Sequence, residues 1–269
     1  MIKRILQDWK KYAGEKGILV YQMGKVGSTS LEKALPNCIH IHTFYNHRPC
    51  YVVAREKRNT FLKRIKGVLY DTLRRTAVKS RKKIKIISLV RDPYSRNISA
   101  FFQDFAYYIY YYSCLTPESQ RDHQANDFVF KIYDDLFDHS YALNWFDKEF
   151  KKFTGIDIYK YPFDKDKGWN IITEGKYEIL IIKLEKLKEA WSCIEEFSSA
   201  KMQLQNSNVA SFKWYSNFYN DFITKYSPSK SYLDLMYKSK FTLHFYNKKE
   251  INFFEERALK TKRHEKYAS

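Results

Sequence analysis

The chain has 269 residues, and 44% of them are hydrophobic, so it can bury a sizeable core and wholesale disorder is excluded. Only 8 glycines and 6 prolines interrupt it, which argues against repeats, collagen-like tracts and long flexible linkers. The 48 Lys and Arg against 30 Asp and Glu give a net charge of +18, which indicates anionic partners such as a nucleotide cofactor, an acidic glycan, nucleic acid or a membrane surface.

The N-terminal segment gives no sign of a targeting or membrane-spanning element. Residues 1–23 contain no apolar run long enough for the core of a signal peptide or for a membrane span. Residues 106–115 are aromatic but too short to cross a bilayer. We therefore expect a cytoplasmic, soluble protein.

The first predicted strand covers residues 17–23, a short apolar run that contains β-branched residues. A glycine-containing loop follows it, and then a segment with helix-start chemistry. Ser28, Thr29 or Ser30 can cap this helix, and Glu32 lies in its first turn. The sequence thus predicts a strand, a tight loop and a helix N-terminus in direct succession.

Two histidines mark the second predicted strand, residues 37–44, in which isoleucine and histidine alternate. This spacing places His40 and His42 on one face of the strand. Histidine is the natural general base near neutral pH, so both are candidates, with His47 as a third.

A basic segment separates this strand from the third. Residues 53–83 predict a surface helix with loops, and residues 83–90 form the most strongly apolar strand. Asp92 and Pro93 are the preferred residues for the start of a helix, which we expect to be long and aromatic.

The second half of the chain predicts helices around one hairpin. Residues 122–153 are mostly amphipathic and helical, with Gly155 as a stop. Residues 156–187 predict a strand, a hairpin with its bend near Glu174 and Gly175, and a buried strand. Helices follow, and no linker is evident. We predict one α/β domain, residues 1–269, with a central parallel sheet flanked by helices and a helical C-terminal part.

The four cysteines show neither C-x-x-C pairing nor the His/Cys spacing of a zinc site. We expect Cys38, Cys50, Cys114 and Cys193 to be unpaired thiols in a reducing compartment, and we predict no metal site.

The first loop suits an anion. In a parallel sheet, ligands bind outside the carboxyl ends of the strands, and helix N-termini attract phosphate and sulfate. Its candidate ligands are Gly24, Lys25, Gly27, Ser28, Thr29 and Ser30. A Walker A loop has its lysine after the last glycine, whereas Lys25 lies between two glycines. The Lys25 side chain would therefore reach a bridging oxygen of a bound anion rather than a terminal phosphate.

The second loop suits another anion. Arg91 follows the third predicted strand, and its guanidinium can bind phosphate with two hydrogen bonds. Arg96 and Ser99 share a helix face three residues apart. Two anion sites on adjoining strands fit a cofactor with phosphates at both ends of a nucleoside.

Together, the two loops resemble those of the sulfotransferases that use 3′-phosphoadenosine 5′-phosphosulfate (PAPS). Residues 22–30, QMGKVGSTS, look like the 5′-phosphosulfate loop of that superfamily, and residues 89–101, LVRDPYSRNISAF, look like its 3′-phosphate loop. The remainder is similar to a bacterial group of capsular polysaccharide synthesis proteins. The Lys-Trp-Tyr-Ser motif of that group is present at 213–216, although Phe212 replaces the expected asparagine.

This resemblance implies a P-loop-like sulfotransferase fold and transfer of a sulfuryl group from PAPS to a hydroxyl of a cell-surface glycan or its precursor, with no metal. Lys25 would neutralise the leaving oxygen, and the other residues of the first loop would hold the 5′ end. Arg91 and Ser99 would bind the 3′-phosphate of PAPS and of the product, adenosine 3′,5′-bisphosphate. Glycan sulfotransferases of the uronyl type carry a similar His-x-His with the second histidine as base, which favours His42, supported by His40.

Several alternatives stay open. The chain could be a nucleotide-dependent kinase with a degenerate loop, although the third strand ends in Arg91 and not in a Walker B acid. It could also be a non-catalytic basic module that binds glycan or nucleic acid, or an inactive family member. Lys213 and Tyr215 could contact cofactor or acceptor, whereas Trp214 and Tyr215 could instead pack in the core. We expect a glycan as partner and no nucleic acid, with peripheral association with membrane-bound polysaccharide assembly machinery as an open alternative.

Overall fold

The structure is a computed structural model that describes residues 2–45, 61–115, 127–201 and 214–259. The chain divides into two compact units. Unit 1 comprises residues 1–47, 59–91 and 144–207, and unit 2 comprises residues 48–58, 92–143 and 208–269. The single domain that the sequence indicates stays a prediction.

Unit 1 contains a five-stranded sheet with the order β2-β1-β3-β5-β4. The first four strands of this order are parallel, and β4 pairs antiparallel with β5. This arrangement confirms the α/β class predicted from the sequence. The strands are β1 (Ile18–Tyr21), β2 (Cys38–Ile41), β3 (Ile84–Val90), β4 (Trp169–Glu174) and β5 (Tyr177–Lys183).

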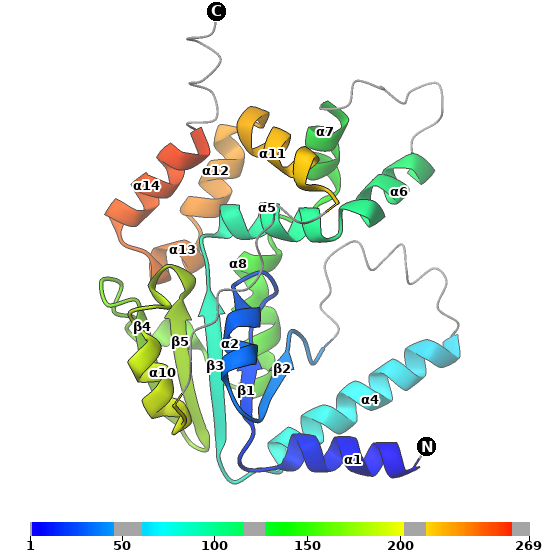
Figure 1. Ribbon diagram of the computed structural model, residues 1–269, viewed down its shortest axis with the longest axis vertical. Coiled ribbons are helices and arrows are strands. Elements are labelled where there is room, and N and C mark those ends of the chain that lie inside the picture. Colours follow the sequence, from blue (N-terminus) through cyan, green and yellow to red (C-terminus); the bar gives the residue numbers. More distant parts are fainter. Residues whose placement is uncertain (1, 46–60, 116–126, 202–213, 260–269) are drawn as a thin grey trace, which may run out of the picture. The chain divides into compact units, whose positions relative to one another are not determined.

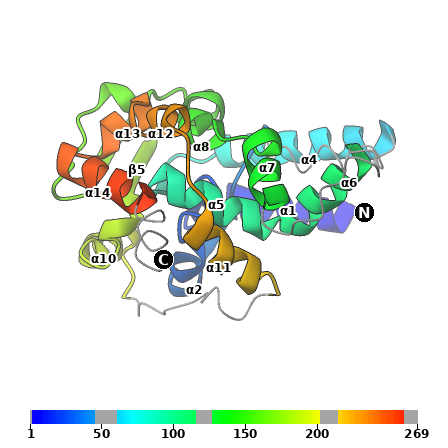
Figure 2. The ribbon, with the colours of Figure 1, turned by 90° about the horizontal axis from the view of Figure 1, so that it is seen from above.

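Helices cover both faces of this sheet. Figures 1 and 2 show α2 and α10 on one face and α4 on the other. Because β2 and β3 flank β1 on opposite sides, right-handed connections put the helices that follow β1 and β2 on opposite faces. The helical segments of unit 1 are α1 (Ile2–Ala13), α2 (Ser28–Ala34), α4 (Phe61–Lys79), a π-helical turn η2 (Phe146–Phe150), α9 (Lys151–Thr154), the 3-10 turns η3 (Ile158–Lys160) and η4 (Leu184–Lys186), and α10 (Trp191–Ser198).

The interior strands β3 and β5 are buried almost throughout, which explains why their sequences are so apolar. In each of them, every residue except the second is buried, as expected for strands that are covered on both faces. Such strands appear in the sequence as continuous apolar runs. Gly175 adopts a positive φ in the bend that joins β4 to β5, which confirms the predicted hairpin.

Two predicted elements differ from the structure. The long aromatic helix is broken at Asp104, because the Asp104 carbonyl accepts hydrogen bonds from Tyr107 and Tyr108 and starts a second helix. Aspartate is disfavoured in helix interiors because it competes for backbone groups. The strand predicted at the start of 156–187 is instead the turn η3, which the Asp157 side chain caps at the amide of Tyr159.

The described part of unit 2 is helical (Figure 1), and its helices pack around aromatic side chains. Phe101 lies at the centre of this core, with Phe105, Tyr133 and Phe222 against its ring. The helices are α5 (Pro93–Gln103), α6 (Phe105–Leu115), α7 (Asp127–Leu136), α11 (Ser216–Lys225), α12 (Lys230–Tyr237), α13 (Lys240–Phe245) and α14 (Lys248–Leu259). The helix α8 (Tyr141–Trp145) has its first three residues in unit 2 and its last two in unit 1.

A buried carboxylate, Glu149 of η2, holds the chain that follows β2. Its side chain is fully buried and accepts hydrogen bonds from the Tyr21 hydroxyl at 2.8 Å and the Thr43 hydroxyl at 3.0 Å. The backbone amides of Phe44 and Tyr45 donate to the same carboxylate. Burial of a charge is costly unless hydrogen bonds compensate it, so these donors explain how Glu149 is accommodated.

We predict that Glu149→Ala destabilises the protein by about 3 kcal/mol, because several buried donors lose their acceptor at once. Urea unfolding followed by circular dichroism measures the change. Lys148→Ala, at an exposed position of the same turn, is the control and should change stability by less than about 0.5 kcal/mol. Equal stabilities for the two variants would contradict the role of Glu149.

Candidate functional site at the carboxyl ends of the parallel strands

Arg91, the residue of the second predicted loop that belongs to unit 1, contacts the first loop at the carboxyl ends of the parallel strands. β1 and β3 are parallel neighbours, and the guanidinium of Arg91 donates a hydrogen bond to the carbonyl of Lys25 at 3.1 Å. Lys25 itself has a φ of 71°, unusual for a residue other than glycine, and its side chain is half-buried. The strand order reverses at β1, and open α/β sheets bind ligands at such a point.

Gln22 joins the ends of three strands directly before this loop. Its backbone amide donates to the carbonyl of Ile41, the last residue of β2, at 3.2 Å. Its side-chain oxygen accepts from the amide of Leu89 in β3 at 3.0 Å. The register of β1 and β3 pairs Leu19 with Ile86 and Val20 with Ile87, so the buried Gln22 side chain continues the contact where the two strands diverge. The sequence alone carried no signal for this role.

Gly27 is required by its conformation and by a neighbour. Its φ is 86°, in the left-handed region. A side-chain Cβ at this position would clash with Cδ1 of Leu184, which follows β5. The sequence indicated that glycine lets the backbone approach an anion, whereas the structure adds that Leu184 occupies the space a Cβ would need.

The hydroxyl residues of the first loop open α2. The N-cap position of α2 is occupied by Gly27, and not by Ser28, Thr29 or Ser30 as the sequence indicates. Thr29 is half-buried in the first turn, and the side chains of Ser28 and Ser30 lie outside the described residues.

The two histidines are adjacent but differ in environment. Their ring centroids are 4.1 Å apart, so both lie on the same side of β2 as predicted. His42 is exposed, and its ring lies next to Gly24, where a Cβ would be 3.9 Å from His42 Cε1. Nδ1 of His42 lies 3.1 Å from the carbonyl of Gln22. Since a carbonyl only accepts, Nδ1 carries the hydrogen, and the neutral ring has its lone pair on Nε2.

His40 is less suited to act as a base. Its Nδ1 lies 2.8 Å from the Glu32 carboxylate, and its Nε2 is buried. Burial, and secondly the neighbouring His42, lower the pKa of His40 to about 4. The neutral ring donates Nδ1–H to Glu32, a carboxylate that works against this lowering because it favours the protonated form. His40 thus contacts both Glu32 and the ring of His42, and its role as a support for a catalytic His42 stays a prediction.

The other predicted residues belong to unit 2 or lie outside the described residues. Ser99 is half-buried on α5 of unit 2. Tyr215 is in the core of unit 2, 5.8 Å from the ring of Phe102, so the core alternative holds for it. His47 and Lys213 lie outside the described residues.

Unit 2 contains an ion pair at the start of α5 that the sequence did not reveal. Asp92 is buried and caps α5 by accepting from the amides of Tyr94 and Ser95, as predicted. Its carboxylate also accepts from Arg257 of α14 at 2.7 Å and from the hydroxyl of Tyr237 at 3.1 Å. Arg257 therefore offsets the charge of Asp92, the residue that follows Arg91 in the second loop.

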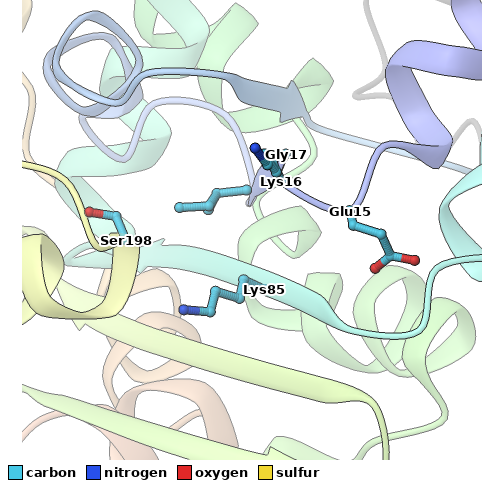
Figure 3. A pocket seen from close by; sticks show the side chains of 6 residues that line it. Glu15, Lys16, Gly17, Lys85 and Ser198 are labelled. Carbon is cyan, nitrogen blue, oxygen red and sulfur yellow. The ribbon is translucent and has the colours of Figure 1, made fainter.

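A pocket of about 300 Å³ opens at the opposite, amino end of the sheet (Figure 3). It is lined by Glu15, Lys16, Gly17, Ile18, Lys85 and Ser198. Lys85 donates to the carbonyl of Phe197 at 2.8 Å, and Glu15 accepts from the amide of Lys82 at 2.8 Å. Because these charged groups are already engaged, the pocket does not form the candidate site.

Within the part of the chain that the structure describes, histidine, cysteine, aspartate and glutamate side chains form no cluster that could hold a metal ion. Among the described helices, none is both long and apolar enough to span a membrane. The described cysteines, Cys38, Cys114 and Cys193, are free thiols.

We predict that Gly27→Ala destabilises the protein by about 3 kcal/mol, through both backbone strain and the clash with Leu184. Gly155→Ala is the matched control, because Gly155 has a similar φ of 82° but open space around it, and should cost about 1 kcal/mol. Adding Leu184→Ala to Gly27→Ala should recover part of the difference. Chemical denaturation measures all three, and equal losses at Gly27 and Gly155 would exclude the clash.

Comparison with known proteins gives one match. A family model described as "Putative capsular polysaccharide synthesis protein" matches residues 124–247, less than half of the chain. The matched range includes the Lys-Trp-Tyr-Ser motif, which confirms this part of the resemblance seen in the sequence. No curated protein and no solved structure matches the chain. The match shows that residues 124–247 are similar to the proteins that this family model describes.

Proposed function

We propose that the protein transfers a sulfuryl group from PAPS to a hydroxyl of a glycan, with the P-loop-like fold of sulfotransferases. The observation that carries this proposal is the contact between Arg91 and the Lys25 loop, with His42 beside Gly24. The Arg91 guanidinium, the backbone of the Lys25 loop and a candidate base thus lie at the point where the strand order of the sheet reverses.

The chemistry follows from the charges. The acceptor oxygen attacks sulfur in line, its proton goes to Nε2 of His42, and the bond between sulfur and the bridging phosphate oxygen breaks. Lys25 neutralises the charge that develops on that oxygen, while the backbone of Gly24–Ser30 holds the 5′ end. Arg91 binds the 3′-phosphate, and the resemblance assigns Ser99 to the same group. The product nucleotide is adenosine 3′,5′-bisphosphate.

The acceptor class comes from a different part of the chain. The family description for residues 124–247 names capsular polysaccharide synthesis, which supports a polysaccharide or its precursor as acceptor. The net charge of +18 favours both an anionic donor and an acidic glycan.

A thermal-shift titration tests the cofactor class. Adenosine 3′,5′-bisphosphate should stabilise the protein more than ATP or ADP at the same concentration, because binding to the folded state raises the melting temperature. A larger response to ATP would favour a phosphotransferase instead.

We predict that Lys25→Ala lowers sulfuryl transfer at least about 100-fold, because the leaving oxygen loses its counter-charge. The fold should stay intact, since the Lys25 carbonyl, not its side chain, accepts from Arg91. Lys33→Ala, at an exposed position of α2, is the control. Transfer from radiolabelled PAPS measures the rate, and near wild-type turnover by Lys25→Ala would refute the role.

We predict that His42→Gln lowers transfer at least about 100-fold while affinity for adenosine 3′,5′-bisphosphate stays within about threefold, because a base acts on the acceptor and not on the nucleotide. Wild-type turnover should fall at acidic pH as the base becomes protonated, and this fall should be absent in His42→Gln. His40→Gln should stay within about tenfold of wild type. The reverse result, with the acid limb lost in His40→Gln, would make His40 the base.

A further inference from the structure

Trp214 is the most exposed large hydrophobic residue that the structure describes. Its side chain is 66% exposed, whereas the next residue, Tyr215, is 7% exposed. The Lys-Trp-Tyr-Ser motif therefore turns one aromatic ring into the core of unit 2 and the other out to solvent. Packing accounts for Tyr215 and leaves Trp214 unexplained.

The outward ring rests on a rigid aromatic base. The indole stacks on Phe105 with a centroid distance of 5.9 Å and an angle of 21° between the planes. Phe105 is fully buried and is itself held by the rings of Phe102 and Phe218. Tyr215 meets the indole edge-on at 5.7 Å. These contacts restrain the ring without covering it.

The residues next to Trp214 in the sequence are unlike those of a stable protein interface, which needs a contiguous apolar patch. The polar residues Ser216, which is half-buried, and Asn217, which is exposed, follow Trp214 and Tyr215 in the chain. A sugar ring has both an apolar C–H face, which stacks on an aromatic face, and hydroxyls that need polar partners. Carbohydrate therefore suits this combination better than another protein does.

We infer that Trp214 is a stacking platform for a sugar ring of the acceptor glycan. The inference rests on the proposed function for the acceptor class, since the family description that names polysaccharide synthesis covers this residue. It gives a role to the outward ring of the motif and leaves Tyr215 as its structural counterpart. Trp214 binds acceptor, while the donor is bound by other residues.

The test measures glycan binding separately from transfer. Wild type, Trp214→Ala, Trp214→Phe and the control Phe253→Ala are titrated with heparosan, chitin and maltose hexasaccharides by calorimetry, without PAPS. Phe253 is also aromatic, lies in unit 2 and is 58% exposed. At least one hexasaccharide should bind wild type, and Trp214→Ala should weaken it about tenfold, with Trp214→Phe intermediate because a smaller ring still stacks.

Tryptophan fluorescence gives a second readout. Binding should shift the emission of wild type and of Phe253→Ala but not of Trp214→Phe. In the transfer assay, Trp214→Ala should raise KM for the acceptor about tenfold and leave KM for PAPS unchanged.

Any of four results would overturn the inference. The first three are wild-type affinity in Trp214→Ala, equal weakening in Phe253→Ala, and no binding of any hexasaccharide to wild type. A change in oligomeric state of Trp214→Ala on size-exclusion chromatography would also overturn it, because the ring would then be an interface between copies. Trp214-dependent glycan binding without any PAPS-dependent transfer would sustain this inference while the proposed function failed.

Discussion

The candidate site depends on how the ends of three parallel strands are held together at Gln22. The pairing of β1 with β3 ends at Val20 and Ile87, and a gap beyond that point would leave backbone amides without acceptors. The Gln22 side chain takes the place of a backbone carbonyl for Leu89, while its own backbone bonds to Ile41 and to the His42 ring. One buried residue thus orders the strand that leads to Arg91, the loop that carries Lys25 and the candidate base.

Two buried carboxylates hold backbone groups in place, one in the segment after β2 and the other at the start of α5. Glu149 collects donors from the segment after β2 in unit 1, and Asp92 collects donors at the start of α5 in unit 2. An isolated buried charge would cost several kcal/mol, so each is retained only because hydrogen bonds or Arg257 compensate it. An apolar residue at either position could pack, but it could not hold backbone amides in a defined direction. The two carboxylates therefore contribute order more than net stability.

Aromatic side chains carry a double role in unit 2. Tyrosine and phenylalanine fill its interior in edge-on and stacked pairs, and several tyrosine hydroxyls are paired internally, as between Tyr133 and Tyr232 at 2.7 Å. Phe105, which belongs to this aromatic interior, also stacks under the exposed indole of Trp214. A rigid interior directly beneath an exposed ring lowers the entropy lost when that ring stacks on a ligand.

Local patterns in the sequence determined the strands β1, β2, β3 and β5, the hairpin, the Asp92 cap and the placement of His40 beside His42, because apolar runs and residue spacing act over a few neighbouring residues. From the sequence, the contact of Arg91 with the Lys25 loop could be expected only because the strands before them, β1 and β3, were predicted to be neighbours. Tertiary structure alone decided that Leu184 constrains Gly27, that Arg257 pairs with Asp92, and that Trp214 faces outward while Tyr215 faces inward. These outcomes join residues far apart in the chain, and which partners meet is set by packing that no local pattern contains.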